Sequence, residues 1–127
     1  MTGERPIRVL LVEDNEVYRT SLAFLLGRER DLEVVGAVGE GAAAARACAE
    51  LAADAVVLDY RLPDVDGAQA AEEVRARCPG AAVILLSASV GDEEQEAART
   101  ASAPLVGKDA GVGALVAAIR EAVRYGA

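Results

Sequence analysis

The sequence contains no histidine, and only 3% of its residues are aromatic. Without histidine, the chain cannot form a Ser-His-Asp or Cys-His catalytic centre, and it lacks the commonest ligand of transition metals. It also cannot itself donate a phosphoryl group from a phosphohistidine. The few aromatic side chains are too sparse to form the platforms on which nucleic-acid bases stack.

Cysteine is scarce too, with Cys48 and Cys78 far apart in the sequence and not in a C-x-x-C pair. Each falls on an apolar stripe of helical spacing. We therefore expect two buried free thiols, without a metal-binding or redox role.

Long apolar runs are also missing, since none approaches the roughly 20 residues of a membrane-spanning helix. Residues 1–6 lack the apolar core of a signal peptide, so a cytoplasmic location is the default expectation. The formal net charge of −8 argues against nucleic-acid binding by this domain, because such binding requires a basic patch. It does not exclude a DNA-binding domain elsewhere in a longer protein.

The sequence is rich in short apolar runs of strand length, which alternate with stripes of helical spacing. The runs are residues 7–12, 32–38, 55–58, 82–86 and, more weakly, 104–106. Runs that are apolar on both faces suit a buried parallel sheet covered by helices. The pattern predicts a single α/β domain of residues 7–125, a flavodoxin-like (βα)5 doubly wound parallel sheet with strand order 2-1-3-4-5. Residues 1–6 would form a tail, and a linker could begin at residues 126–127.

The helical stripes differ in strength. The last is the clearest, and the segment 91–100 is polar with only alanines to bury, so we expect a helix that packing holds weakly. The stripes consist of Tyr18, Leu22, Leu25 and Leu26; Ala44, Ala45, Cys48 and Leu51; Ala70, Ala71, Val74 and Cys78; and Val112, Leu115, Val116, Ile119 and Val123.

Polar residues stand where the predicted strands end. Glu13 and Asp14 follow the first strand, Asp59 the third and Ser87 the fourth, while the fifth leads to Lys108. Ligands of open α/β sheets bind beyond the carboxyl ends of the strands, and the first and third strands would be neighbours there. Three converging carboxylates repel one another unless a cation joins them, and a few carboxylates completed by water suit Mg²⁺.

This set of groups fits phosphoryl transfer. A carboxylate beside Mg²⁺ can attack phosphorus, while Lys108 and the Ser87 hydroxyl can bind the remaining phosphoryl oxygens. Ala88 leaves room for the group. Taken singly, Asp14 or Asn15 could cap a helix, Asp59 could be a turn residue, Ser87 a cap and Lys108 a surface charge. All four coincidences at one edge of the sheet would be improbable.

With these residues the chain resembles the receiver domain of bacterial two-component response regulators. The resemblance covers about residues 7–125 and depends on Glu13-Asp14, the segment Asp59-Tyr60-Arg61-Leu62-Pro63-Asp64-Val65-Asp66-Gly67, Ser87-Ala88 and Lys108. The segments 32–36 and 107–110 look most like receivers of regulators with a LuxR-type (NarL/FixJ-like) helix-turn-helix.

The resemblance implies a role for each residue. Asp59 would be the phosphoacceptor, supplied by a sensor histidine kinase, and Ser87 and Lys108 would bind the phosphoryl group. The metal ligands would be Asp14, Asp59 and the backbone carbonyl of Arg61, with Glu13 acting mainly through water. Pro63 and Gly67 would shape the loop after Asp59. The domain would be a signalling switch with self-phosphorylation from donors and slow autodephosphorylation, not an enzyme in the usual sense.

The resemblance also implies an output in transcription regulation. The surface of residues 88–125 would bind a second receiver or an effector domain. One position departs from the family pattern, because Leu105 stands where receivers usually carry an aromatic residue that swings inward on activation. The phosphorylation chemistry should survive this change, and coupling would run instead through the helix after Ser87.

Two alternatives remain open. Residues 39–44 fit the G-x-G-x-x-A fingerprint of dinucleotide-binding domains, with Asp59 near the expected acidic position. However, Glu40 would face the pyrophosphate, the chain is short for two mononucleotide halves, and the strand-end residues would be unexplained. The other alternative is a degenerate receiver that binds a partner without being phosphorylated, against which the complete residue set argues. A Walker-type nucleotide site is excluded because the chain has no G-x-x-x-x-G-K-[ST].

Overall fold

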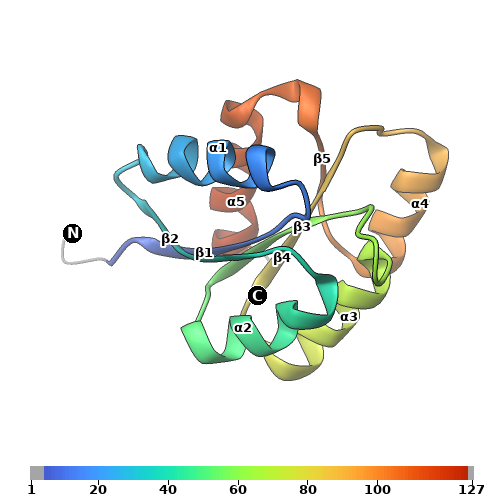
Figure 1. Ribbon diagram of the computed structural model, residues 1–127, viewed down its shortest axis with the longest axis horizontal. Coiled ribbons are helices and arrows are strands. Elements are labelled where there is room, and N and C mark those ends of the chain that lie inside the picture. Colours follow the sequence, from blue (N-terminus) through green and yellow to red (C-terminus); the bar gives the residue numbers. More distant parts are fainter. Residues whose placement is uncertain (1–4, 126–127) are drawn as a thin grey trace.

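The computed structural model describes residues 5–125, where five β-strands alternate with five α-helices (Figure 1). The strands are β1 (Ile7–Val12), β2 (Leu32–Val38), β3 (Ala55–Asp59), β4 (Ala82–Ser87) and β5 (Leu105–Gly107). The α-helices are α1 (Glu16–Gly27), α2 (Ala44–Leu51), α3 (Gly67–Arg77), α4 (Asp92–Ala101) and α5 (Val112–Tyr125). Short 3-10 turns, η1 (Gly41–Ala43) and η2 (Lys108–Ala110), precede α2 and α5. The predicted linker at residues 126–127 lies outside the described residues, as does most of the predicted tail.

The five strands form one parallel sheet in the order β2-β1-β3-β4-β5, which confirms the predicted fold class and topology. The register aligns the carboxyl ends of neighbouring strands: Val12 pairs with Leu58, Asp59 with Leu86, and Ser87 with Gly107. Residues that directly follow β1, β3, β4 and β5 therefore meet at one edge of the sheet.

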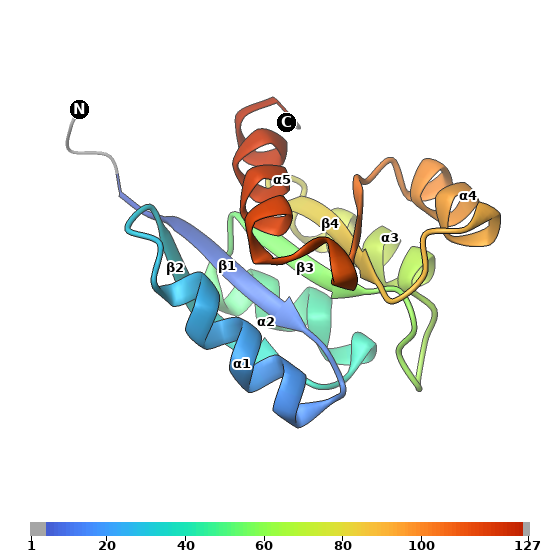
Figure 2. The same ribbon diagram turned by 90° about the horizontal axis from the view of Figure 1, so that it is seen from above.

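Helices cover both faces of this sheet, as the two ribbon views show (Figure 1, Figure 2). Helices α1 and α5 pack against one face around Val9, Leu11 and Ile119. Helices α2, α3 and α4 pack against the other around Leu10, Leu58 and other buried residues. All five residues of β3 are buried, because the strand lies centrally and has helices above and below it. This burial explains why the strands read as continuous apolar runs.

Helix α1 begins at a polar cap and buries a narrow stripe. Asn15 is the N-cap, and its side chain accepts a hydrogen bond from the Tyr18 backbone amide. Leu22 and Leu26 are buried as predicted, whereas Leu25 is 39% exposed. The cap assigns the start of the helix to Asn15, so Asp14 immediately before it is left to the strand-end cluster.

Helix α4 lies beside β5 at the end of the sheet (Figure 1) and differs from the predicted segment in one respect. It buries Ala98 and Ala101, as expected for a helix with few large apolar side chains, but it also buries Glu94. The prediction that only alanines are buried here was therefore wrong. Sequence periodicity treats every glutamate as solvated, so it gives no sign that Glu94 is buried.

The two cysteines are free thiols. Cys48 is buried, and Cys78 is half-buried at the C-cap of α3. Burial, and next a hydrogen bond with Cys78, raise the pKa of the Cys48 thiol to about 12, which disfavours the reactive thiolate. Within residues 5–125, no helix combines the length and the apolar character needed to cross a membrane.

Candidate functional site

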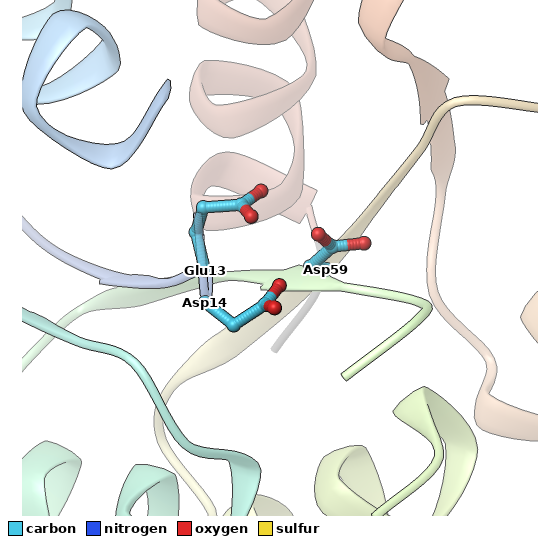
Figure 3. Close-up of side chains that lie close together, drawn as sticks. All are labelled: Glu13, Asp14 and Asp59. Atoms are coloured by element: carbon cyan, nitrogen blue, oxygen red, sulfur yellow. The ribbon is translucent and has the colours of Figure 1, made fainter. Parts of the chain in front are cut away.

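Three carboxylates meet at the carboxyl edge of the sheet (Figure 3). Glu13 and Asp14 directly follow β1, and Asp59 is the last residue of the adjacent strand β3. One oxygen from each carboxylate lies within 4.8 Å of the other two. The convergence predicted from the sequence therefore exists, and it follows from the parallel pairing of two strands that end at the same level.

The three carboxylates differ in exposure. Glu13 and Asp59 are only 2% and 4% exposed, whereas Asp14 is exposed to solvent. Glu13 accepts a hydrogen bond from the Asn15 backbone amide at 2.9 Å, and Asp59 accepts one from the Arg61 amide at 3.0 Å. The two buried carboxylates are thus fixed in place, while Asp14 faces the water from which a cation would arrive.

Lys108 joins the buried carboxylates. Its Nζ atom lies 2.8 Å from Glu13 Oε1 and 3.0 Å from Asp59 Oδ2, and 4.5 Å from the centre of the Tyr18 ring. Burial of the ammonium group favours the neutral form, but hydrogen bonds to Glu13 and Asp59 outweigh it and raise the pKa of Lys108 above its usual value. Lys108 is therefore a component of the cluster, and its interpretation as a solvated surface charge is wrong.

Ser87 ends β4 beside the same cluster and is 1% exposed. Its Oγ accepts a hydrogen bond from the Ser89 backbone amide at 3.2 Å. Pairing of Ser87 with Gly107 places it next to the residue that precedes Lys108. Ala88, which follows, is exposed and adds only a methyl group at the mouth of the site.

The loop between β3 and α3 folds tightly against the end of β3. The Gly67 amide donates a hydrogen bond to the Tyr60 carbonyl at 3.1 Å. The backbones of Arg61 and Asp66 pair in an isolated antiparallel β-bridge. A Cβ atom on Gly67 would lie 2.9 Å from the Tyr60 Cα atom, so only glycine permits this approach. Pro63 is exposed in the same loop.

Asp64 ties this loop to the start of α2. Its carboxylate accepts hydrogen bonds from the backbone amides of Gly41 and Ala42 at 3.0 and 2.8 Å. The amides of Ala42 and then Gly41 hold the pKa of Asp64 below its usual range. A Cβ on Gly41 would collide with Val65, which explains the glycine. The amides that a pyrophosphate would need in a dinucleotide site are thus already bound by a carboxylate of the same chain.

The same loop contacts α4, and no pattern in the sequence predicts these contacts. The Tyr60 hydroxyl donates to Glu93 Oε2 at 3.0 Å, and Arg61 Nη2 lies 3.6 Å from Glu94 Oε2. Arg61 also lies over the Tyr60 ring, 5.4 Å from its centre. Only the tertiary packing of α4 beside the loop brings these four side chains together.

Comparison with known proteins gives a consistent result. The family model for the response regulator receiver domain matches residues 9–120. VraR of Staphylococcus saprophyticus is 34% identical over 89 residues, covering 70% of this chain and 43% of that protein. The DNA-binding transcriptional activator DevR/DosR of Mycobacterium tuberculosis is 37% identical over 87 residues, covering 68% of this chain and 40% of that protein. The chain spans less than half the length of these curated relatives.

Solved structures agree. The receiver domain of the response regulator NarL from Mycobacterium tuberculosis superimposes with a TM-score of 0.88 at 28% identity, covering 96% of this chain and 99% of that one. A LuxR-family two-component response regulator from Aurantimonas gives a TM-score of 0.87 at 27% identity, with 94% and 86% coverage.

The sheet, its acidic strand-end cluster and the family match define the class: this chain belongs to the response regulator receiver domain family. Within that family it is close to the receivers of LuxR-type transcription regulators, as the resemblance predicted. Receiver domains of this family bind Mg²⁺ at an acidic pocket, and in this chain Glu13, Asp14 and Asp59 form an acidic cluster.

Proposed function

We propose that Asp59 is the phosphoacceptor of this receiver and takes its phosphoryl group from a sensor histidine kinase. The observation that carries the proposal is the cluster in which Lys108 bridges Glu13 and Asp59 while Asp14 stands exposed beside them. A buried carboxylate held next to an ammonium group is both a nucleophile and a site where negative charge can accumulate.

Hard oxygen ligands at this spacing fit Mg²⁺, with water completing the coordination. The ligands would be Asp14, Asp59 and the backbone carbonyl of Arg61, and Glu13 would act mainly through water. Bound Mg²⁺ would offset the negative charge that gathers on the phosphoryl oxygens.

The chain's own residues supply the remaining requirements of the transfer. A carboxylate oxygen of Asp59 forms the new bond to phosphorus as the bond from phosphorus to the donor breaks, and the leaving group keeps that electron pair. Lys108 neutralises a phosphoryl oxygen from the position it already occupies beside Asp59. Ser87 would turn from the Ser89 amide toward another oxygen, and the methyl group of Ala88 leaves space for the group.

The same site would allow self-phosphorylation from small donors and slow autodephosphorylation. Hydrolysis requires a water molecule to approach phosphorus in line with the bond to Asp59. The side chains of Arg61 and Ser89, each two residues beyond a site residue, are exposed and would flank that approach. Arg61 would therefore affect the removal of the phosphoryl group more than its addition.

The output would be a change in binding through the surface of residues 88–125, to a second receiver or to an effector domain. DevR/DosR is a DNA-binding transcriptional activator by name, which supports transcription regulation as the role of the whole protein. The chain described here supplies the receiver.

The test is incubation with Mg²⁺ and acetyl phosphate, followed by intact-mass measurement. One added phosphoryl group that hydroxylamine removes is expected, because an acyl phosphate is labile to that reagent. Asp59→Asn should not be labelled, since an amide is a poor nucleophile. Asp109→Asn removes an exposed carboxylate beside Lys108 and is the matched control, which should be labelled normally. Undiminished labelling of Asp59→Asn would place the acceptor elsewhere, and absence of labelling in the unsubstituted chain would favour the degenerate receiver.

A further inference from the structure

Helix α4 buries one carboxylate that the proposed chemistry does not use. The helix is polar and its other two buried residues are alanines, yet the Glu94 side chain is only 6% exposed. Its neighbours Glu93 and Glu96 are exposed. Burying a carboxylate is costly unless a charged or hydrogen-bonding partner accompanies it, so the surroundings of Glu94 decide how α4 sits.

The cationic partner of Glu94 comes from the loop after the proposed phosphoacceptor. Arg61 Nη2 lies 3.6 Å from Glu94 Oε2, and the guanidinium side chain is 67% exposed. The backbone amide of the same Arg61 donates to Asp59 Oδ1 at 3.0 Å. One residue thus contacts the site through its backbone and α4 through its side chain.

We propose that Glu94 is a positioning residue which holds Arg61 on α4, and that phosphorylation of Asp59 makes Arg61 exchange Glu94 for the phosphoryl oxygens. The inference rests on the proposed function and adds to it a route from Asp59 to α4. The Arg61–Glu94 pair would couple Asp59 to the α4 surface. Leu105 cannot provide this coupling, because it lacks the aromatic ring that receivers usually carry at its position.

Charge decides the direction of the exchange. Glu94 offers Arg61 a single negative charge, whereas the phosphoryl group carries about −1.5 to −2 near neutral pH. A guanidinium group also binds phosphate through two parallel hydrogen bonds, while the present contact with Glu94 is a single loose ion pair at 3.6 Å.

Loss of Arg61 leaves Glu94 buried without its cation. The first turn of α4 must then move to hydrate the carboxylate, because an unpaired buried charge is unstable. Little packing resists this motion, since the buried apolar residues of α4 are the alanines Ala98 and Ala101. The surface of α4 therefore changes when the guanidinium group leaves.

Backbone amide hydrogen exchange of residues 91–101 tests whether Arg61 leaves Glu94 for the phosphoryl oxygens. Glu94→Gln removes the charge at nearly constant shape, and Glu96→Gln removes an equal charge from the exposed face of the same helix. Without a phosphoryl mimic, Glu94→Gln should speed exchange of this segment by about threefold relative to Glu96→Gln. With Mg²⁺ and beryllofluoride the difference should shrink, because Arg61 then binds mainly the phosphoryl mimic in both proteins.

A second readout separates positioning from general destabilisation. The half-life of the acyl phosphate should lengthen in Glu94→Gln, because Glu94 no longer competes with the phosphoryl oxygens for Arg61, which then covers the approach of water for more of the time. In an Arg61→Gln background the same substitution should leave the half-life unchanged. An effect that persists without Arg61, or exchange rates equal to those of Glu96→Gln, would overturn the inference.

Labelling keeps the two proposals apart. If the unsubstituted chain is labelled on Asp59 but Glu94→Gln behaves as Glu96→Gln in both readouts, the inference fails and the proposed function stands. If acetyl phosphate gives no acyl phosphate on the unsubstituted chain, the proposed function fails, and the inference that depends on it falls as well.

Discussion

The Nζ atom of Lys108 lies 3.0 Å from Oδ2 of Asp59, although 49 residues separate the two along the chain. The same ammonium group donates a hydrogen bond to Glu13 Oε1 at 2.8 Å, so it offsets the repulsion between two buried carboxylates. Lys108 is also the one lysine of the sequence. Its titration can therefore be followed without interference from other lysine side chains.

Replacement of Lys108 by Met should lower the free energy of unfolding at neutral pH by about 2 kcal/mol, because two buried carboxylates lose a shared partner. The pKa of Lys108 is raised in the folded state, so its stabilising contribution is complete below the unfolded value of about 10.4 and is lost as the pH rises through the higher folded value. Urea unfolding of both proteins from neutral to alkaline pH should show the difference shrinking only above that point.

The matched control for Lys108→Met is Arg99→Met, which removes a positive charge from an exposed pair with Glu96. Surface pairs contribute little, so its unfolding free energy should change by less than about 1 kcal/mol. Equal losses in the two variants would mean that net charge, and not the cluster, sets the effect.

Asp14→Asn should weaken Mg²⁺ binding by at least about tenfold, because the amide keeps the shape of the exposed side chain but loses the charge that draws the cation. Calorimetric titration with MgCl₂ measures this directly. Glu16→Gln, an exposed acid in the first turn of α1, is the control and should bind Mg²⁺ almost normally. Unchanged affinity in Asp14→Asn would remove this residue from the site.

Ser87→Ala should leave Asp59 open to labelling by acetyl phosphate while reducing the change in hydrogen exchange across residues 88–106. The hydroxyl now accepts from the Ser89 amide, and its turn toward a phosphoryl oxygen would pull the following segment. The comparison is made with and without beryllofluoride. A full response in Ser87→Ala would show that the hydroxyl transmits nothing.

Two glycine substitutions should have opposite effects on stability. Gly67→Ala places a methyl group 2.9 Å from the Tyr60 Cα atom and should destabilise the fold by about 1–3 kcal/mol. Gly113→Ala in α5 meets no atom within 4 Å and should stabilise the helix by roughly 0.5 kcal/mol. Thermal melts followed by circular dichroism distinguish them. Similar shifts in both would show that the approach of Gly67 to Tyr60 is not tight.

The strands and their ends could be predicted because the inner strands β1, β3 and β4 are largely buried on both faces and leave nearly continuous apolar runs. The position of Asp59 beside Glu13 then followed from the pairing of parallel neighbours. For Lys108, the sequence predicted only that it lies at the same edge of the sheet as the carboxylates. Its contact with both carboxylates could not be predicted, because the turn η2 determines where the ammonium group lies.

Other features depend on tertiary contacts that no local pattern records. Leu25 fits the apolar stripe of α1 but is 39% exposed, because the helix buries a narrower face than its sequence suggests. Glu94 fits a solvated face but is buried, because Arg61 reaches it from a loop more than thirty residues earlier. For both residues, exposure to solvent depends on which elements pack beside the side chain and not on whether the side chain is apolar or charged.

The loop between β3 and α3 is held unequally on its two sides. Toward α2, Asp64 accepts hydrogen bonds from two backbone amides of the turn η1. Toward α4, the side chains of Tyr60 and Arg61 contact the side chains of the exposed Glu93 and the buried Glu94. The loop is therefore held firmly to η1 by backbone hydrogen bonds and more loosely to α4 by side-chain contacts. We therefore expect a displacement of Asp59 to be transmitted toward α4 and not toward α2.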